Sequence, residues 1–368
     1  MLDAVPGRRR NAPASASEDR RSRAQGGAGP EGLLRRYREA TLAEIKAVLA
    51  SRRLPLYDMM HYHLGAPGPG GRPAAARPGK MLRPTLCLLS CEAVGGQLQQ
   101  AMPAAAAIEL IHNFTLIHDD IEDASQSRHG RDTVWRVWGE PQAINAGDGM
   151  FALAHMALHR LLEAGVVAPQ VLEVARLLDE ACLALCEGQH LDLDFEERLD
   201  VSCDDYLAMI SGKTAALMGA ATAVGALLGK APEDTVGAFK EFGRRLGLAF
   251  QIRDDVLGIW GDAAETGKPA GDDIRDRKKS FPVVYALGRA SENDRLLLRR
   301  VNSADTVALE DVAEVMAVLE RSGARAASEE AVACHVDGAL ACLKGLDLVP
   351  ARRRELETLA LYLVRRRR

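Results

Sequence analysis

Aromatic residues are scarce in this chain of 368 residues, of which phenylalanine, tryptophan and tyrosine together make up 4%. Alternating runs of β-branched and aromatic residues, which are typical of strands, are nearly absent as well. The chain therefore lacks the sequence patterns of a fold built on sheets. Alanine and leucine abound instead, and both favour helices. This composition predicts an all-α protein.

An excess of charge of one sign is also missing. The chain has 47 lysines and arginines against 51 aspartates and glutamates, and its formal net charge is −4. Without a general basic field, we expect no binding of nucleic acid. No uninterrupted apolar run approaches the roughly 20 residues that span a bilayer, and the amino terminus has no apolar signal-peptide core. We therefore expect a soluble protein that is not integral to a membrane.

Cysteine is limited to seven residues, an odd number scattered through apolar stretches. Cys87 with Cys91 and Cys182 with Cys186 stand at helical spacing, but no further cysteine or histidine follows at the spacing of a zinc site. We expect these two pairs to be buried, reduced thiols rather than metal ligands. Reduced thiols favour a cytoplasmic location.

Apolar residues recur at intervals of three and four from residue 30 onward, which is the period of amphipathic helices. Glycine, proline and asparagine interrupt this pattern at 65–79, 138–142, 229–234 and 261–273. We predict one domain over 31–368, a single large bundle of about ten or more helices with a central apolar cavity. The apolar helices 205–229 and 236–259 are expected at its centre.

The first 30 residues differ from the rest of the chain. They are rich in arginine, alanine, serine and glycine without any period, so we expect residues 1–30 to form a disordered tail. A targeting peptide is the less favoured alternative, because Asp3, Glu18 and Asp19 interrupt the basic character of such peptides.

The segment LIHDDIED, residues 116–123, ends an apolar helix with a crowd of carboxylates. Asp119, Asp120 and Asp123 stand at i, i+1 and i+4, and so lie within an arc of about 100° on one helical face. Unpaired, they would repel one another at a helix end that already carries partial negative charge. Mg²⁺ would remove this repulsion, because it prefers carboxylates together with phosphate oxygens. Alone, the cluster could also be a solvated helix end.

A second pair of adjacent aspartates, Asp254 and Asp255, lies far along another apolar helix. If the two helices face each other, their carboxylates form a metal-binding mouth above an apolar interior. Basic side chains suited to a phosphate group occur beside Gly, Pro or Asp at the expected helix ends. They are Lys80, Arg83, Arg128, Lys213, Lys268 and Lys278. Each alone would pass for a surface charge, but their shared placement favours a diphosphate site.

Seven segments occur in one order along the chain: GKMLRP (79–84), ELIHNFTLIHDDIED (109–123), AGDGM (146–150), EGQHLDLD (187–194), GKTAAL (212–217), FQIRDDVLG (250–258) and GKPAGDDIRDRKKSFP (267–282). In order and spacing they resemble those of the trans-isoprenyl diphosphate synthase (polyprenyl synthetase) family over most of residues 30–365. The resemblance implies an all-helical isoprenoid-synthase fold and a prenyltransferase that condenses isopentenyl diphosphate head to tail with an allylic diphosphate. It also implies about three Mg²⁺ ions and, usually, a homodimer.

The resemblance assigns roles to single residues. The metal ligands and catalytic carboxylates would be Asp119, Asp120, Asp123, Asp254 and Asp255. The allylic diphosphate would be neutralised by Arg128, Lys213 and Lys268, with Gln189 and Gln251 nearby and with Thr214 and Lys278 as further substrate-binding residues. Isopentenyl diphosphate would be held by Lys80, Arg83, His112 and His129. His112 lies two turns before Asp119 on the same helical face, although a lone histidine there is more often a packed core residue.

Two departures from the family pattern affect this assignment. The second aspartate motif usually reads DDxxD, but its last position here is Gly258, and Asp262 could replace the missing carboxylate only if the helix continued. The family commonly has two adjacent arginines after the first motif, where this chain has Arg128 and His129. Binding of isopentenyl diphosphate is therefore expected to be weaker or sensitive to pH.

Product length in the family depends on bulk beneath the first motif. Phe114, five positions before Asp119, and the small Thr115 resemble a common C20 pattern, so the resemblance favours geranylgeranyl diphosphate as the product. On a straight helix, however, Phe114 points about 140° away from Asp119, and an ordinary core position is nearly as well supported. A farnesyl or longer-chain product, a terpene cyclase and a non-catalytic partner of an active synthase are the alternatives.

Overall fold

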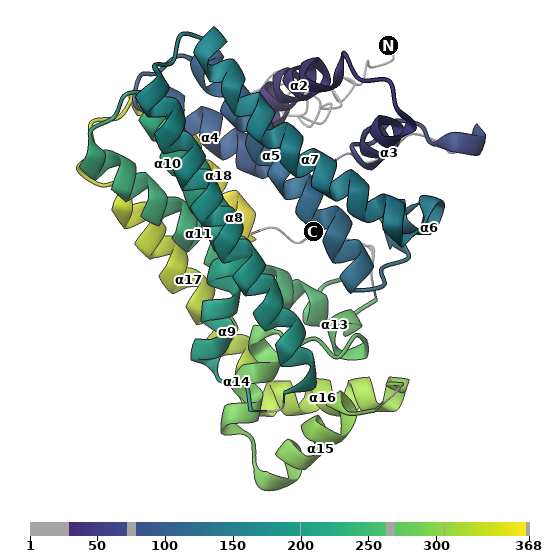
Figure 1. The fold of residues 1–368 in the computed structure, drawn as a ribbon. Helices are drawn as coiled ribbons and strands as arrows, with labels where there is room; N and C mark the ends of the chain where they lie inside the picture. The colour runs from purple at the N-terminus through teal and green to yellow at the C-terminus, as the bar shows by residue number, and fades with distance from the viewer. Residues whose placement is uncertain (1–28, 72–78, 199, 263–268, 305, 366–368) are drawn as a thin grey trace, which may run out of the picture.

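The computed structural model describes residues 29–71, 79–198, 200–262, 269–304 and 306–365, and the predicted all-α fold is confirmed (Figure 1). The elements in chain order are α2 (Pro30–Leu49), α3 (Pro55–His63), the short 3₁₀ turn η2 (Pro69–Gly71), α4 (Leu82–Ala93), α5 (Leu98–Glu122), β1 (Ser127–Arg128), β2 (Arg131–Asp132), α6 (Val134–Trp138), α7 (Glu140–Glu163), α8 (Ala168–Glu197), α9 (Cys203–Ile210), the π-helical turn η3 (Ser211–Ala215), α10 (Ala216–Leu228), α11 (Glu233–Trp260), α13 (Asp272–Arg275), α14 (Phe281–Arg289), α15 (Glu292–Asn302), α16 (Leu309–Arg321), α17 (Ala324–Cys342) and α18 (Pro350–Arg365).

Long helices packed side by side form the body of the molecule. α5 packs on α7, α10 packs on both α4 and α11, and α17 covers α11 (Figure 1). α5 and α10 owe their central positions to their small side chains, since the run Ala104–Ala107 and most of α10 are fully buried. Small residues let helix backbones approach closely, so this part of the core is dense without aromatic side chains.

The predicted central helix over 205–229 is divided in the structure. α9 ends at Ile210, η3 forms one π-helical turn, and α10 continues from Ala216. By length and composition alone the stretch Cys203–Leu228 would pass as a membrane span, but 67% of its apolar 18-residue window is buried inside the bundle. It is therefore best read as a core helix, which is consistent with a soluble protein.

A two-stranded hairpin follows the first aspartate cluster. β1 pairs antiparallel with β2, and Arg128 stands opposite Arg131. His129 and Gly130 form the turn between them, and both have positive φ, as this type of tight turn requires. The chain then enters α6, and the predicted break at 138–142 shrinks to Gly139 between α6 and α7. The hairpin thus directs Arg128 back toward the end of α5.

One expectation about the cysteines is wrong. Cys87, Cys91 and Cys182 are buried and all seven thiols are free, but Cys186 is exposed. Four residues advance a helix by about 400°, so Cys186 lies about 40° further round α8 than Cys182, toward solvent. The predicted tail falls almost wholly on residues 1–28, outside the described part of the chain, and α2 already begins at Pro30.

Candidate active site

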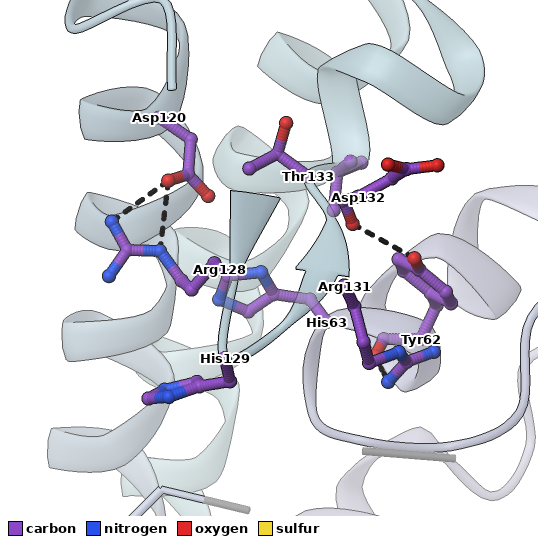
Figure 2. Close-up of a pocket in the computed structure, with 9 residues that line it drawn as sticks. Tyr62, His63, Asp120, Arg128, His129, Arg131, Asp132 and Thr133 are labelled. Atoms are coloured by element: carbon purple, nitrogen blue, oxygen red, sulfur yellow. Dashed lines mark hydrogen bonds and ion pairs between the residues drawn. The ribbon is translucent and has the colours of Figure 1, made fainter. Parts of the chain in front are cut away.

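Asp119 and Asp120 occupy the last turn of α5, and Asp123 caps its carboxyl end. Asp120 is only 1% exposed. Arg128 Nε of β1 donates to Asp120 Oδ1 at 2.9 Å, and Arg128 Nη2 forms an ion pair with the same oxygen at 2.8 Å (Figure 2). The second oxygen, Oδ2, is buried and has no hydrogen-bond partner. A buried carboxylate oxygen without a partner is energetically costly, so it is suited to a cation.

Lys213 reaches the same cluster from η3. Its Nζ lies 3.3 Å from Asp119 Oδ1 and also donates to Asp192 of α8. Burial lowers the pKa of Lys213, but the carboxylates of Asp192 and Asp119 raise it by more. Its pKa therefore lies above the ordinary value, and the ammonium group stays charged. A Cβ on Gly188 of α8 would overlap the main chain of Gly212 and Lys213. Glycine at 188 therefore permits the close crossing that places this lysine.

The carboxylates of the first cluster repel one another, because their charges are only partly matched. Partial burial and the negative charge of Asp119 raise the pKa of Asp123 to about 6, against the opposing effects of Lys213 and Lys278. Among the described residues, no three metal-binding side chains already form a closed cage. Mg²⁺ needs none, because it takes one or two carboxylates together with water and phosphate oxygens. The donor set therefore fits Mg²⁺ held jointly with a diphosphate.

The second aspartate pair lies on α11, and its two members have different surroundings. Asp255 is 6% exposed, and its Oδ2 accepts hydrogen bonds from the Tyr206 hydroxyl and, at 2.8 Å, from the main-chain N–H of Phe281. Gln251 Nε2 donates to its Oδ1 at 3.2 Å, and Gln251 Oε1 in turn accepts from Thr214 at 2.9 Å. Burial raises the pKa of Asp255 to about 7, although these hydrogen bonds oppose the shift. Asp254 is only half-buried.

The absent third carboxylate of this motif has a structural counterpart. α11 ends at Trp260 and Gly261 is extended, so Asp262 does not continue the helical face of Asp254. The carboxylate of Asp273, from α13, instead lies against Gly258, where any Cβ would overlap it. The negative charge of Asp273 also contributes to the raised pKa of Asp255. A carboxylate is therefore present at this position in space, although it comes from a later segment.

The remaining predicted basic residues lie at different points around this site. Lys278 follows α13, is exposed, and interacts electrostatically with Asp123. Its main-chain N–H donates to the carbonyl of Asp273 at 2.9 Å. The loop that carries Lys278 therefore interacts with the first aspartate cluster through Lys278 and with the second through Asp273. Lys80 is exposed just before α4. Lys268 lies outside the described residues, and its predicted role stays a prediction.

Arg83 and His112 meet beside the site, as their predicted common role requires. Arg83 Nη1 lies 3.1 Å from His112 Nε2, and the charge of Asp254 acts on Arg83. The same guanidinium acts on Glu109 of α5, whose pKa burial raises to about 7. Burial, Arg83 and Arg128 lower the pKa of His112 well below its ordinary value. A strongly basic environment therefore adjoins the first aspartate cluster.

A small pocket connects this basic environment with the hairpin. Figure 2 shows Tyr62, His63, Asp120, Arg128, His129, Arg131, Asp132 and Thr133 around it. Tyr62 and His63 belong to the end of α3, and the others come from α5 and the hairpin segment. His129, predicted as a substrate-binding residue, is therefore close to Arg128 and His112 in space. Four basic side chains thus line the pocket, together with the carboxylates of Asp120 and Asp132.

Phe114 and Thr115 lie on α5 about one turn before the first aspartate cluster. The Phe114 ring packs edge to face on Phe151 of α7, with centroids 5.1 Å apart, and on His118 at 5.8 Å. Thr115 Oγ1 donates to the carbonyl of His112 at 2.8 Å. Phe114 thus points toward α7, in agreement with the helical angle that separates it from Asp119.

Sequence reasoning missed Asp192, Tyr206 and His63. Asp192 lies in the quoted segment EGQHLDLD, three residues after Gln189, so helical spacing could have suggested it. Gln189 itself bonds to Glu122, with Nε2 2.7 Å from Oε2. No local signal marks Tyr206 or His63, because both act through long-range contacts. The assembled groups can bind a metal–diphosphate complex, neutralise a second phosphate group nearby and stabilise a leaving anion.

Comparison with known proteins agrees with this geometry. The sequence profile of a family described as "Polyprenyl synthetase" matches residues 72–319. A geranylgeranyl diphosphate synthase of Mycobacterium tuberculosis is 40% identical over 84% of this chain and 88% of its own length. A (2E,6E)-farnesyl diphosphate synthase of Mycobacterium bovis is 39% identical over 84% of this chain and 85% of its own. The crystal structure of a polyprenyl synthetase from Streptomyces coelicolor A3(2) superposes with a TM-score of 0.84 and 37% identity, over 90% of this chain and 99% of that one.

Proposed function

Because this chain belongs to the polyprenyl synthetase family and is a trans-isoprenyl diphosphate synthase, we propose that its product is geranylgeranyl diphosphate. The reaction condenses isopentenyl diphosphate with an allylic diphosphate. Relatives include both geranylgeranyl and farnesyl diphosphate synthases, so family membership leaves C15 and C20 products open. Thr115 beside Phe114 favours the longer product, since farnesyl-making enzymes of the family often carry a second aromatic at that place.

In this proposal Asp119, Asp120, Asp123 and Asp254 would hold Mg²⁺ together with the allylic diphosphate. The partnerless Oδ2 of Asp120 is the single observation that carries the metal assignment. Asp255, predicted as a fifth ligand, has both oxygens hydrogen-bonded within the protein, so its role is to position α11 and Gln251. When bound, Mg²⁺ supplies positive charge that neutralises the leaving diphosphate.

The side chains of the protein provide the remaining steps. Lys213 and Arg128 donate to diphosphate oxygens and favour cleavage of the allylic C–O bond, which leaves a delocalised carbocation. Arg83, His112 and Lys80 hold isopentenyl diphosphate so that its double bond attacks this carbocation and forms the new C–C bond. A proton is then lost, with the released diphosphate as a suitable base, and its electron pair forms the new double bond. Apolar walls keep water away from the cation.

The direct experiment is incubation of the purified protein with Mg²⁺, labelled isopentenyl diphosphate and each of the C5, C10 and C15 allylic diphosphates. Products are sized after dephosphorylation. A C20 alcohol supports the proposal, whereas C15 or longer alcohols would keep the reaction and replace the product. A hydrocarbon formed without isopentenyl diphosphate would indicate a cyclase, and no turnover at all would indicate a non-catalytic partner.

Phe114→Ala is expected to lengthen the product beyond C20. The substitution removes a ring between α5 and α7, where Phe114 packs on Phe151, and opens space between these helices, where this proposal puts the end of the growing chain. The paired change Thr115→Tyr adds bulk one residue further on and is expected to shorten the product to C15. Chromatography of the dephosphorylated products measures both effects. An unchanged distribution in both variants would place the limiting wall elsewhere.

We also propose that two copies of the chain associate, in the cytoplasm, through the outer faces of α7 and α8. Ile144, Phe151 and Leu162 are exposed at positions that lie within about 20° of one another around α7. Leu172 and Leu183 are 71% and 63% exposed on one face of the neighbouring α8. Such apolar stripes on adjacent helices are typical of an interface between subunits.

Leu183→Glu is therefore expected to convert a dimer into monomers, because a carboxylate in an apolar interface has no partner. Light scattering coupled to size-exclusion chromatography measures the mass in solution. Leu296→Glu is the matched control, since Leu296 is 56% exposed on the distant α15. A Leu183→Glu protein that stays dimeric would refute this interface.

A further inference from the structure

The ring of Phe114 is one end of a row of side chains that runs from α5 over α7 to α8. Phe114 packs edge to face on Phe151 of α7, with ring centroids 5.1 Å apart, and Phe151 packs in the same way on His155, at 4.6 Å. His155 Nε2 lies 2.8 Å from Asp179 Oδ1 of α8. α7 packs on both α5 and α8, so three neighbouring helices contribute to one continuous row.

Phe151 stands on the outer face of α7 rather than in the core. Its side chain is 37% exposed. Because part of this ring has no protein around it, its position depends on the few side chains that it contacts. Phe114 is on one side of it, and His155, about one helical turn further along α7, is on another. A phenylalanine in this place therefore needs His155 to hold it against Phe114.

His155 is itself fixed by two hydrogen bonds. Its Nδ1 lies 3.0 Å from the main-chain carbonyl oxygen of Phe151, and its Nε2 lies 2.8 Å from the carboxylate of Asp179. Both partners are acceptors, so both ring nitrogens donate and the charged imidazolium is favoured. Partial burial lowers the pKa of His155, but these two hydrogen bonds raise it by more. A cationic ring in edge-to-face contact with a phenylalanine is favourable, so Asp179 and His155 together hold Phe151.

His118 flanks Phe114 on its other side. The centroids of the two rings are 5.8 Å apart. His118 Nε2 lies 3.3 Å from the carbonyl oxygen of Ile144 on α7, and a Cβ on Gly147 would overlap the His118 ring. Phe114 is therefore held between His118 and Phe151, and removal of either neighbour would let its ring move.

We propose that Phe151 is a further determinant of product length, held in place by His155 and Asp179, because it keeps the Phe114 ring across the end of the growing isoprenoid chain. This inference rests on the proposed function, which puts the end of that chain between α5 and α7. Phe114 is the residue that the chain meets, and Phe151 is a positioning residue that acts through it. Without Phe151 the Phe114 ring can rotate toward the outer face of α7, and room for a further five-carbon unit appears.

The product lengths of the full-length protein test this role, with Mg²⁺, labelled isopentenyl diphosphate and a C15 primer. Phe151→Ala is expected to raise the ratio of C25 and longer products to C20 product about tenfold, since small changes of apolar bulk in a pocket alter discrimination by that order. His155→Ala and Asp179→Ala should shift the ratio in the same direction by a smaller factor. Phe151→Leu keeps most of the apolar bulk and should restore a mainly C20 product.

Leu162→Ala is the matched control for Phe151→Ala. Leu162 is 51% exposed on the same face of α7, about three turns from Phe151 and outside the row. Its removal should leave product length unchanged, and light scattering reports whether either variant changes the mass in solution.

A double variant tests whether Phe151 acts through Phe114. Phe114→Ala with Phe151→Ala should give the product distribution of Phe114→Ala alone, because two changes to one wall are not additive. Effects that add in the double variant would place Phe151 on a separate wall and overturn its action through Phe114.

The other outcomes separate this role from the proposed function. An unchanged product ratio in Phe151→Ala, or an equal shift in Leu162→Ala, would overturn the role of Phe151 while the unmodified protein still made geranylgeranyl diphosphate. Failure of the unmodified protein to form a C20 product would overturn the proposed function itself. If Phe151→Ala proves unstable, His155→Ala decides: a shift to longer products supports the row, and an unchanged ratio in a folded protein opposes it.

Discussion

Asp119→Asn is expected to reduce kcat/KM about a thousandfold, the loss that corresponds to several kcal/mol of stabilisation of the leaving group. Asp119 lies in the last turn of α5, with one oxygen 3.3 Å from Lys213 and the other 3.7 Å from Arg128. The asparagine side chain keeps the shape of the aspartate. It lacks the negative charge that attracts Mg²⁺ and that orders the side chains of Lys213 and Arg128. Initial rates with a C15 primer, measured over a range of Mg²⁺ concentrations, test this expectation.

Glu122→Gln is the matched control for Asp119→Asn. Glu122 is in the same last turn of α5, but it is exposed and accepts a hydrogen bond from Gln189. Removing its charge should leave kcat/KM within a fewfold of the unmodified protein. If Asp119→Asn retained full activity at limiting Mg²⁺, the first aspartate cluster would not be the metal site.

Lys213→Met is expected to lower kcat/KM for the allylic substrate about a hundredfold, because one charge-assisted contact to the leaving diphosphate disappears. The same change leaves Asp119 and Asp192 facing each other without their shared cation. The pair would then repel, so Mg²⁺ should partly restore the folded stability that the variant loses. Steady-state kinetics with and without excess Mg²⁺, together with thermal melting, measure both effects.

Lys240→Met separates this effect from general loss of a surface charge. Lys240 lies on α11 and pairs with Glu180 at 3.7 Å, with its side chain 52% exposed. Exposed ion pairs of this kind contribute little to stability, so neither activity nor melting should change noticeably. Activity in Lys213→Met that matched the Lys240→Met control would remove Lys213 from the diphosphate site.

The predicted roles differ in how well geometry supports them. Arg83 with His112, and Asp119 with Lys213 and Arg128, are brought together as their predicted roles require. Asp255 lies at the predicted place, but the hydroxyl of Tyr206 and the main chain at Phe281 occupy one of its oxygens. Such partners come from distant segments, and no spacing along α11 could have indicated them. Lys268 remains outside the described residues, so its role rests on the family resemblance alone.

The sequence by itself determined the helical class of the fold and the first aspartate cluster. Helical periodicity and the adjacency of Asp119, Asp120 and Asp123 are local properties, so they follow from spacing along one helix. The collinear motifs were likewise sufficient to identify the family to which the chain belongs.

Only the tertiary structure decided which side chains complete the site. Asp273 lies against Gly258, Asp192 shares Lys213 with Asp119, and His63 enters the basic pocket from α3. Each of these contacts joins segments that are far apart in the chain, and its geometry depends on how helices cross. Helix crossings are set by the packing of many small buried side chains at once, and a repeat along one segment carries no information about them.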